Sequence, residues 1–343
     1  AFYGGYFAMA FPAAMFIRKF SYKAGVLLGL GLYAFGAFLF FPAKMTGEYY
    51  PFLIAYFILT CGLSFLETSC NPYILSMGTE ETATRRLNLA QSFNPMGSLL
   101  GMYVAMQFIQ AKLHPMCTED RALLNDSEFQ AIKESDLSVL IAPYLIIGLV
   151  IVAMLLLIRF VKMPKNGDQN HRIDFFPTLK RIFTQTRYRE GVIAQFFYVG
   201  AQIAVWSFVI RYAMQQLDFD GVLASLGNPA SAHAVVDALR NVEPVSAAFY
   251  NGCEWLGLND LLPRTAEQAA ATYYIMSLIL FVAMRFLCTG MMKYVKAYKL
   301  LIGLAILAVL CCVGAMFGKG SFGVYCLMGI SGCMSLMFPT IYG

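Results

Sequence analysis

The feature that most constrains this chain is a series of nine apolar runs, each about 18 to 25 residues long, which is the length a helix needs to cross a bilayer. Hydrophobic residues make up 59% of the 343 residues, and charged residues only 13%. A soluble domain does not have this composition. The sequence therefore predicts an all-α polytopic membrane protein. The runs are 1–17, 24–43, 51–77, 87–110, 139–161, 191–213, 271–291, 299–317 and 321–340.

The charges between these runs predict an orientation. Segment 111–138 carries six acidic and three basic residues, and segment 214–270 carries seven acidic and two basic ones. Cytoplasmic loops of membrane proteins are enriched in Lys and Arg, so we expect these two acidic segments outside and the basic segments in the cytoplasm. The basic segments carry Arg18, Lys19 and Lys23, then Arg85 and Arg86, then residues 162–189, then Lys293, Lys296 and Lys299.

A long basic connection divides the chain into two halves. We expect a first helix bundle at 1–161, a cytoplasmic loop at 162–190 and a second bundle at 191–343 with an outer insertion at 214–270. Both ends of the sequence lie inside apolar runs, so we expect one span to precede it and two to follow, giving six plus six. That is the layout of a two-bundle transporter, although an accidental split in another polytopic protein would look similar. The insertion has apolar residues at helical spacing, which favours short amphipathic helices on the membrane or over an entrance, or else a plain surface decoration.

Glu67 is the only charged residue in the run 51–77. Charged residues inside membrane spans are costly and usually mark a transport path or a proton relay, so Glu67 is a functional candidate. Asn71 lies four residues further on and shares its helix face. The alternative is a carboxylate paired with an Arg only to hold helices together.

The next run begins with amide side chains at intervals of three, Asn88, Gln91 and Asn94. Amides both donate and accept hydrogen bonds, which suits the hydroxyl groups of a sugar. The alternative role is hydrogen bonding between helices.

A further polar stripe follows in the run 191–213, where Gln195, Tyr198, Gln202 and Trp206 recur every three or four residues. Aromatic rings beside an amide are typical of carbohydrate sites, but such a stripe also occurs in ordinary packing. Arg285, inside the run 271–291, could pair with Glu67 or with an acid outside this sequence, or could extend to the membrane interface.

Other function classes find no support in the sequence. His114, His171 and His233 lack metal-ligand spacing, and there is no phosphate-binding glycine loop or nucleophile with a nearby base. The nine cysteines are interpreted as structural, although Cys117 and Cys253 lie in hydrophilic loops and could pair. Nucleic-acid binding is not indicated. The glycines of GVLLGLGLYAFG indicate close helix packing.

Several strings in this chain resemble the fucose:proton symporter family of the major facilitator superfamily, which includes glucose and galactose permeases. They are FSYKAGVLLGLGLYAFGA, FLETSCNPYIL, RRLNLAQSFNPMGS, AQFFYVGAQIAVWSFVIRYA and MSLMFPTIYG. The resemblance implies a twelve-helix transporter of the bacterial inner membrane. It assigns the membrane-embedded glutamate of the family to Glu67 and its glutamine and asparagine to Gln91 and Asn94. The second essential acid of the family, an aspartate on the first helix, has no counterpart in this sequence.

These observations predict a secondary active transporter and not an enzyme. In this hypothesis a monomer in the lipid bilayer imports L-fucose, galactose or glucose with a proton by alternating access, and it needs no cofactor. Glu67 carries the proton, Gln91 and Asn94 hold sugar hydroxyls from the first half, and Gln202 with Trp206 contribute from the second, with Asn71 and Tyr198 as further contacts. The alternatives are a sodium-coupled glucose/galactose carrier and a sugar receptor of the same fold that does not transport.

Overall fold

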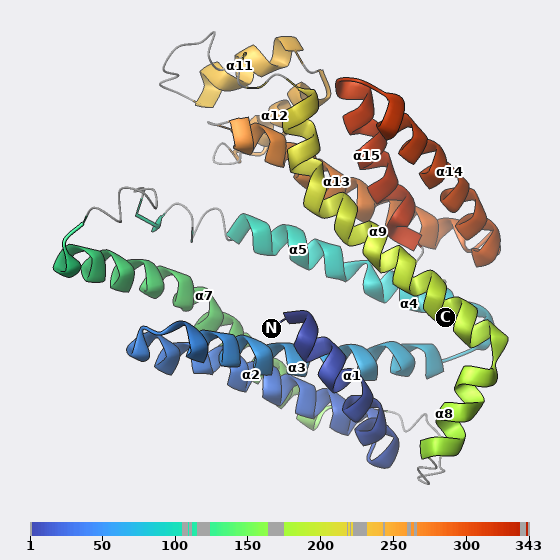
Figure 1. Ribbon diagram of the computed structural model, residues 1–343. Helices are drawn as coiled ribbons and strands as arrows, with labels where there is room; N and C mark the ends of the chain where they lie inside the picture. Colours follow the sequence, from blue (N-terminus) through green and yellow to red (C-terminus); the bar gives the residue numbers. More distant parts are fainter. Residues whose placement is uncertain are drawn as a thin grey trace. The chain divides into compact units, whose positions relative to one another are not determined.

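A computed structural model of the chain describes residues 2–104, 109, 112–114, 124–163, 175–217, 219, 221, 232–242, 244–258, 262–263, 266–336 and 341. Every regular element in this described part is a helix (Figure 1). Contacts divide the chain into two compact units, Ala1–Ala83 with Met102–Thr178 and Thr84–Gly101 with Leu179–Gly343. The prediction of an all-α fold is therefore confirmed. The predicted boundary between the two helix bundles at residue 161 stays a prediction. The two units defined by contacts follow a different division, since Thr84–Gly101 group with the second unit.

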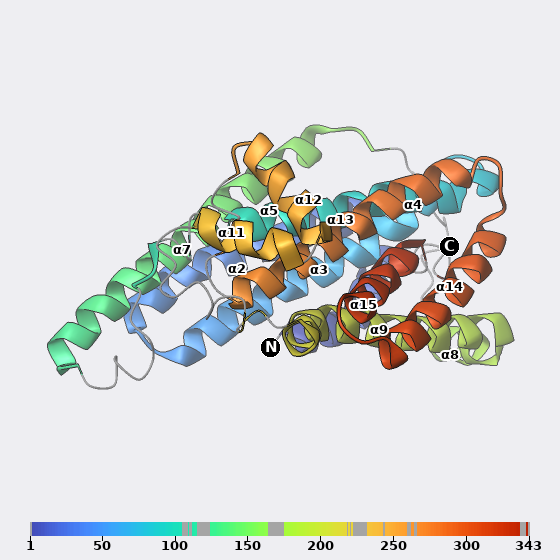
Figure 2. The ribbon, with the colours of Figure 1, turned by 90° about the horizontal axis from the view of Figure 1, so that it is seen from above.

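The described residues of the first unit form mainly four helices and a short 3-10 turn. They are α1 (Phe2–Lys19), α2 (Tyr22–Thr46), α3 (Tyr49–Ser76), η1 (Glu80–Thr82) and α7 (Asp126–Phe160). Helix α2 packs against both α3 and α7 (Figure 2). Helix α1 packs against α3. Rings also stack across the α2–α7 contact, where the Phe40 and Tyr144 centroids lie 4.2 Å apart.

Glycines bring α2 and α3 into backbone contact. A Cβ atom added to Gly62 would lie 2.7 Å from the carbonyl oxygen of Gly29, and one added to Gly36 would lie 2.7 Å from the Cα of Leu59. Both distances are too short for real atoms, so only glycine fits. The expectation of close packing around these glycines is confirmed.

Polar side chains hold α2 and α7 together at both ends. Near the start of α2, the Lys23 ammonium donates to the carbonyls of Arg159, at 3.1 Å, and Val161, at 2.7 Å, just where α7 runs out of internal donors. At the other end of α2, Gly47 adopts a left-handed conformation, with φ 62°, and its carbonyl accepts from Lys133 of α7 at 2.9 Å.

The second unit contains more of the described helices than the first. They are α4 (Ala83–Gln91), α5 (Phe93–Val104), α9 (Thr186–Gln216), α11 (Ala232–Val242), α12 (Pro244–Trp255), α13 (Ala266–Met291), α14 (Ala297–Phe317), α15 (Ser321–Cys333) and η5 (Met334–Leu336). Helix α15 packs against α9, α13 and α14. The short helix α8 (Phe175–Thr184) crosses the boundary between the units.

The described helices of the insertion belong to the core of the second unit. Val235, Val236 and Leu239 on α11 are at most 1% exposed and belong to one core cluster with residues of three long helices. That cluster also contains Val209 and Ala213 of α9, Ala269, Ala270 and Tyr273 of α13, Val324 and Met328 of α15, and Tyr250 and Cys253 of α12. The surface-decoration alternative is therefore wrong for α11 and α12, which we call the cap.

Six helices of the described residues are long and apolar enough to cross a membrane. They are Tyr22–Thr46, Tyr49–Ser76, Asp126–Phe160, Thr186–Gln216, Gln268–Met291 and Ala297–Phe317, and Ser321–Leu336 is a shorter apolar helix. The expected span 87–110 is not continuous, because α4 ends at Gln91 and α5 begins at Phe93. The described residues thus contain a partial set of the expected spans.

Candidate functional site

The carboxyl group of Glu67 is paired with a tyrosine that sequence reasoning did not single out. Glu67 lies on α3 and shares a side-chain hydrogen bond with the hydroxyl of Tyr6 on α1. Its side chain is exposed on the surface of the first unit, whereas Ser64 and Ser69 on either side are buried. No Lys or Arg described in this unit forms an ion pair with it. An acidic group inside an apolar helix is thus held by a neutral partner.

Small residues bring Tyr6 close to Glu67. A Cβ atom added to Gly5 would lie 3.1 Å from the Cβ of Thr60 and 3.2 Å from the carbonyl oxygen of Phe57, so α1 meets α3 closely at this glycine. The Ser64 hydroxyl also donates to the Tyr6 carbonyl, at 3.2 Å. The string GGY at residues 4–6 was the available signal, since adjacent glycines in an apolar run indicate a close helix contact that leaves the next side chain in a fixed place.

Asn71 follows Glu67 by one helical turn and is 6% exposed. Pro72 lies within α3 without ending it. The structure therefore places both polar side chains on successive turns of one long apolar helix, as the sequence spacing predicted.

Gln91 lies at a break between two helices of the second unit. A continuous α-helix would require the backbone N–H of residue 95 as donor to the Gln91 carbonyl, but residue 95 is proline. Just before the break, the Ser92 nitrogen still donates to the Asn88 carbonyl, at 3.0 Å, as in a regular helix, and also to the Leu89 carbonyl, at 3.1 Å. Gln91 is half-buried, and Asn94 is exposed on the first turn of α5.

Asn88 serves to join two helices. It is fully buried, and its amide nitrogen donates to the Thr289 hydroxyl at 2.6 Å and to the Arg285 carbonyl at 3.3 Å. For Asn88 the structure therefore favours the alternative role of hydrogen bonding between helices.

Arg285 is buried in the second unit, with 3% of its surface exposed. Its Nη1 donates to the Gln91 carbonyl at 2.8 Å and its Nε to the Ser335 carbonyl at 2.7 Å. The guanidinium carbon also lies 4.7 Å from the centre of the Phe281 ring. The side chain thus ends inside the second unit, bound to the backbone of two other segments.

The predicted stripe on α9 faces the interior of the second unit. Tyr198 is 6% exposed and donates to the Met334 carbonyl at 3.2 Å. Trp206 donates through Nε1 to the Ser331 hydroxyl at 3.0 Å, and its ring meets that of Phe281 edge to face. Gln202 is half-buried on the same helix. These contacts are those of packing, and a role in sugar binding for the three residues stays a prediction.

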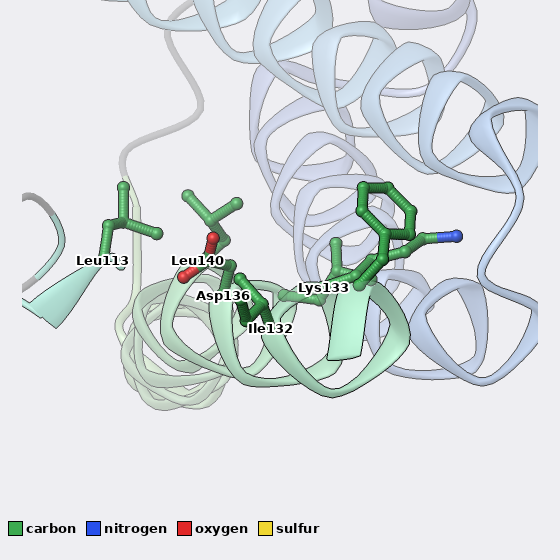
Figure 3. A pocket seen from close by; sticks show the side chains of 7 residues that line it. Leu113, Ile132, Lys133, Asp136 and Leu140 are labelled. Atoms are coloured by element: carbon green, nitrogen blue, oxygen red, sulfur yellow. The ribbon is translucent and has the colours of Figure 1, made fainter. Parts of the chain in front are cut away.

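A cavity of about 330 Å³ lies in the first unit at the start of α7, and none of the predicted site residues lines it (Figure 3). Its walls are mostly apolar, with one carboxylate, Asp136, which accepts a hydrogen bond from the His114 backbone nitrogen at 3.0 Å. The other lining residues are Leu113, Phe129, Ile132, Lys133, Leu137 and Leu140. One acidic group that is already bound gives this cavity few donors or acceptors for a polar solute. Among the described residues, no group of three His, Cys, Asp or Glu side chains could hold a metal ion.

Long apolar helices with isolated polar side chains define a class of protein, the multi-pass membrane transporter. The family comparison agrees, because the model of the family described as "Major Facilitator Superfamily" matches residues 1–343. The chain belongs to the major facilitator superfamily, in the family of fucose:proton symporters and glucose/galactose transporters. It is therefore a member of a transporter family and not an enzyme.

Individual relatives support this assignment. The L-fucose-proton symporter of Haemophilus influenzae is 40% identical, over 100% of this chain and 71% of the relative. A glucose/galactose transporter of Brucella abortus is 27% identical, over 99% of this chain and 68% of the relative. A solved structure of the E. coli fucose:proton symporter superposes with a TM-score of 0.81 at 31% identity, covering 99% of this chain and 73% of that one.

Proposed function

We propose that this chain belongs to a sugar:proton symporter that imports L-fucose or a related hexose by alternating access. The observation that carries the proposal is Glu67, an acid in a long apolar helix whose hydrogen-bond partner is the neutral Tyr6. A carboxyl group with a neutral partner can gain and lose a proton without breaking an ion pair. The L-fucose-proton symporter relative, at 40% identity, supports both the substrate class and the coupling ion.

The roles of the remaining residues follow from their chemistry. Gln91 and Asn94 provide amide groups beside the break between α4 and α5, where they can hold sugar hydroxyls. Gln202 and Trp206 are the expected contribution from α9, with Asn71 and Tyr198 as further contacts. Pairing of Arg285 with an acid would use N–H donors beyond the two that bind backbone carbonyls, since the guanidinium group has five. We place the protein in the inner membrane of a bacterium.

The test replaces Glu67 by Gln in the full-length transporter in proteoliposomes. Glutamine keeps the shape and the hydrogen bonding of the side chain but cannot carry a proton, so uphill accumulation driven by a pH gradient should be lost. Exchange of labelled sugar across the membrane should continue, because it requires no net proton movement. Glu48→Gln, the same change at the exposed start of α3, is the matched control and should accumulate normally. Normal accumulation by Glu67→Gln would disprove the assignment.

A sodium-coupled glucose/galactose carrier is the second candidate, because glucose/galactose transporters are 27 to 28% identical to this chain. Glu67 would then contribute to an ion site. Replacing the pH gradient by a sodium gradient separates the two: accumulation under sodium alone would favour this candidate. Competition among fucose, galactose and glucose then identifies the sugar, since a buried polar site discriminates strongly between hydroxyl arrangements.

A further inference from the structure

Arg285 binds two backbone carbonyls that share a property visible only in the sequence. Each belongs to a residue that stands four positions before a proline: Gln91 before Pro95, and Ser335 before Pro339. In an α-helix the carbonyl of a residue accepts from the N–H four positions later, and proline has no N–H. Pro95 thus leaves the Gln91 carbonyl without its helical donor.

The guanidinium group is suited to replace the missing donor at Gln91 and to bind the Ser335 carbonyl as well. It is planar and carries five N–H donors in a fixed arrangement, and here Nη1 and Nε each reach one carbonyl, at 2.8 and 2.7 Å. The charge is buried, and the described ion pairs of this unit belong to Arg240, so carbonyl dipoles and the Phe281 ring stabilise it instead.

Hydrogen bonds also fix the backbone of Arg285. Its carbonyl accepts from the Thr289 hydroxyl at 2.8 Å and from the Asn88 amide at 3.3 Å. Asn88 lies on α4, one turn before Gln91. Helices α4 and α13 are therefore joined by a side chain from each helix, and Arg285 extends the connection to η5.

We propose that Arg285 is a positioning residue that replaces the backbone donor absent at Pro95 and so fixes the broken helix that presents Gln91. The link to Gln91 as a sugar ligand rests on the proposed function. The replacement of the helical donor at Gln91 does not rest on the proposed function, and it is tested without sugar.

The first experiment is a double-mutant cycle between Arg285→Gln and Pro95→Ala in the full-length transporter. Arg285→Gln should lower the apparent melting temperature by several degrees, because the Gln91 and Ser335 carbonyls lose the hydrogen bonds that Arg285 donates. Pro95→Ala supplies the N–H that Gln91 lacks, so in the Arg285→Gln background it should restore a large part of the loss. Equal effects of Pro95→Ala in both backgrounds would overturn the proposal, as would an Arg285→Gln protein of unchanged stability.

A matched control uses another proline within an apolar helix. Pro72→Ala changes α3, whose carbonyls are not among the two acceptors of Arg285, so it should not restore the Arg285→Gln protein. If Arg285→Gln fails to fold, the double variant decides: recovery of folded protein with Pro95→Ala but not with Pro72→Ala supports the proposal, and recovery with neither contradicts it.

The second experiment separates positioning from general stability. Arg285→Gln should weaken sugar binding about tenfold when Gln91 is no longer held. Leu239→Ala in the cap destabilises the same unit by loss of packing and should leave sugar affinity unchanged well below its melting temperature. Equal affinity losses would mean that Arg285 is merely structural. Absence of sugar binding in the wild type, with an intact double-mutant cycle, would refute the proposed function alone.

Discussion

At the level of single residues, Glu67 and Tyr6 form the central polar contact of the first unit. The hydroxyl is a neutral donor, so it can remain near the carboxyl group in either protonation state, accepting from the protonated form and donating to the ionised one. An Arg in the same place would favour only the ionised state. The pairing with Tyr6 therefore suits a group that has to change its charge during each transport cycle.

Tyr6→Phe removes this hydroxyl while keeping the ring. A hydrogen bond of this kind contributes about 1 kcal/mol, so we expect proton-driven sugar accumulation to slow about fivefold. Initial uptake rates in proteoliposomes measure the effect. Tyr33→Phe, the same change on α2, is the control and should transport at the normal rate. An equal loss in both variants would show that the hydroxyl of Tyr6 has no special role.

At the level of helices, backbone contact between α2 and α3 holds the first unit together. The positions where the two helices touch are glycines, and the atoms that an added methyl group would meet are backbone atoms that cannot rotate away. Helix α3 carries Glu67, so the α2–α3 contact also fixes where the carboxyl group lies. The contact between α2 and α3 depends on uninterrupted helices. Between α4 and α5, by contrast, the helix is interrupted before Pro95, and the polar residues Gln91 and Asn94 lie beside the interruption.

Gly62→Ala tests this packing. The new methyl group would lie 2.9 Å from the Tyr33 Cα, so the helices must separate, at a cost of about 1 to 3 kcal/mol. A clear fall in apparent melting temperature is expected. At Gly31, an added Cβ would meet only the Leu155 Cδ1 atom, at 3.8 Å, so Gly31→Ala should be neutral or stabilising by up to about 1 kcal/mol. Similar melting temperatures for the two variants would refute the packing argument.

At the level of the whole molecule, the cap belongs to the core of the second unit. Leu239, Tyr250 and Tyr273 come from the cap and from α13, yet each is at most 1% exposed within a single cluster. Arg240 adds ion pairs to Asp237 at 2.6 Å and Glu254 at 2.7 Å, which are partly exposed and contribute little compared with the apolar contacts. The cap should therefore separate from the long helices only when the second unit loses its packing.

Cys253 on α12 reports this separation. It is 5% exposed, and burial raises the pKa of its thiol, so less of the reactive thiolate exists near neutral pH. We expect Cys253 to resist maleimide in the native protein and to react after denaturation or in Leu239→Ala. Leu256→Cys, at a position that is 62% exposed, is the accessible control. Rapid native labelling of Cys253, measured by mass spectrometry, would show that the cap is not packed as described.

The sequence alone determined the helical class, because an apolar segment inside a membrane has to satisfy its own backbone hydrogen bonds and its length shows directly in the chain. It also determined Glu67 and Asn71 as polar residues on one helix face, which follows from local spacing. Only the tertiary structure decided that Tyr6 meets Glu67, that Arg285 reaches the Gln91 carbonyl across a sequence separation of 194 residues, and that the insertion is core. These contacts depend on which helix faces meet, and helical periodicity shows that a face exists without showing which partner it packs against.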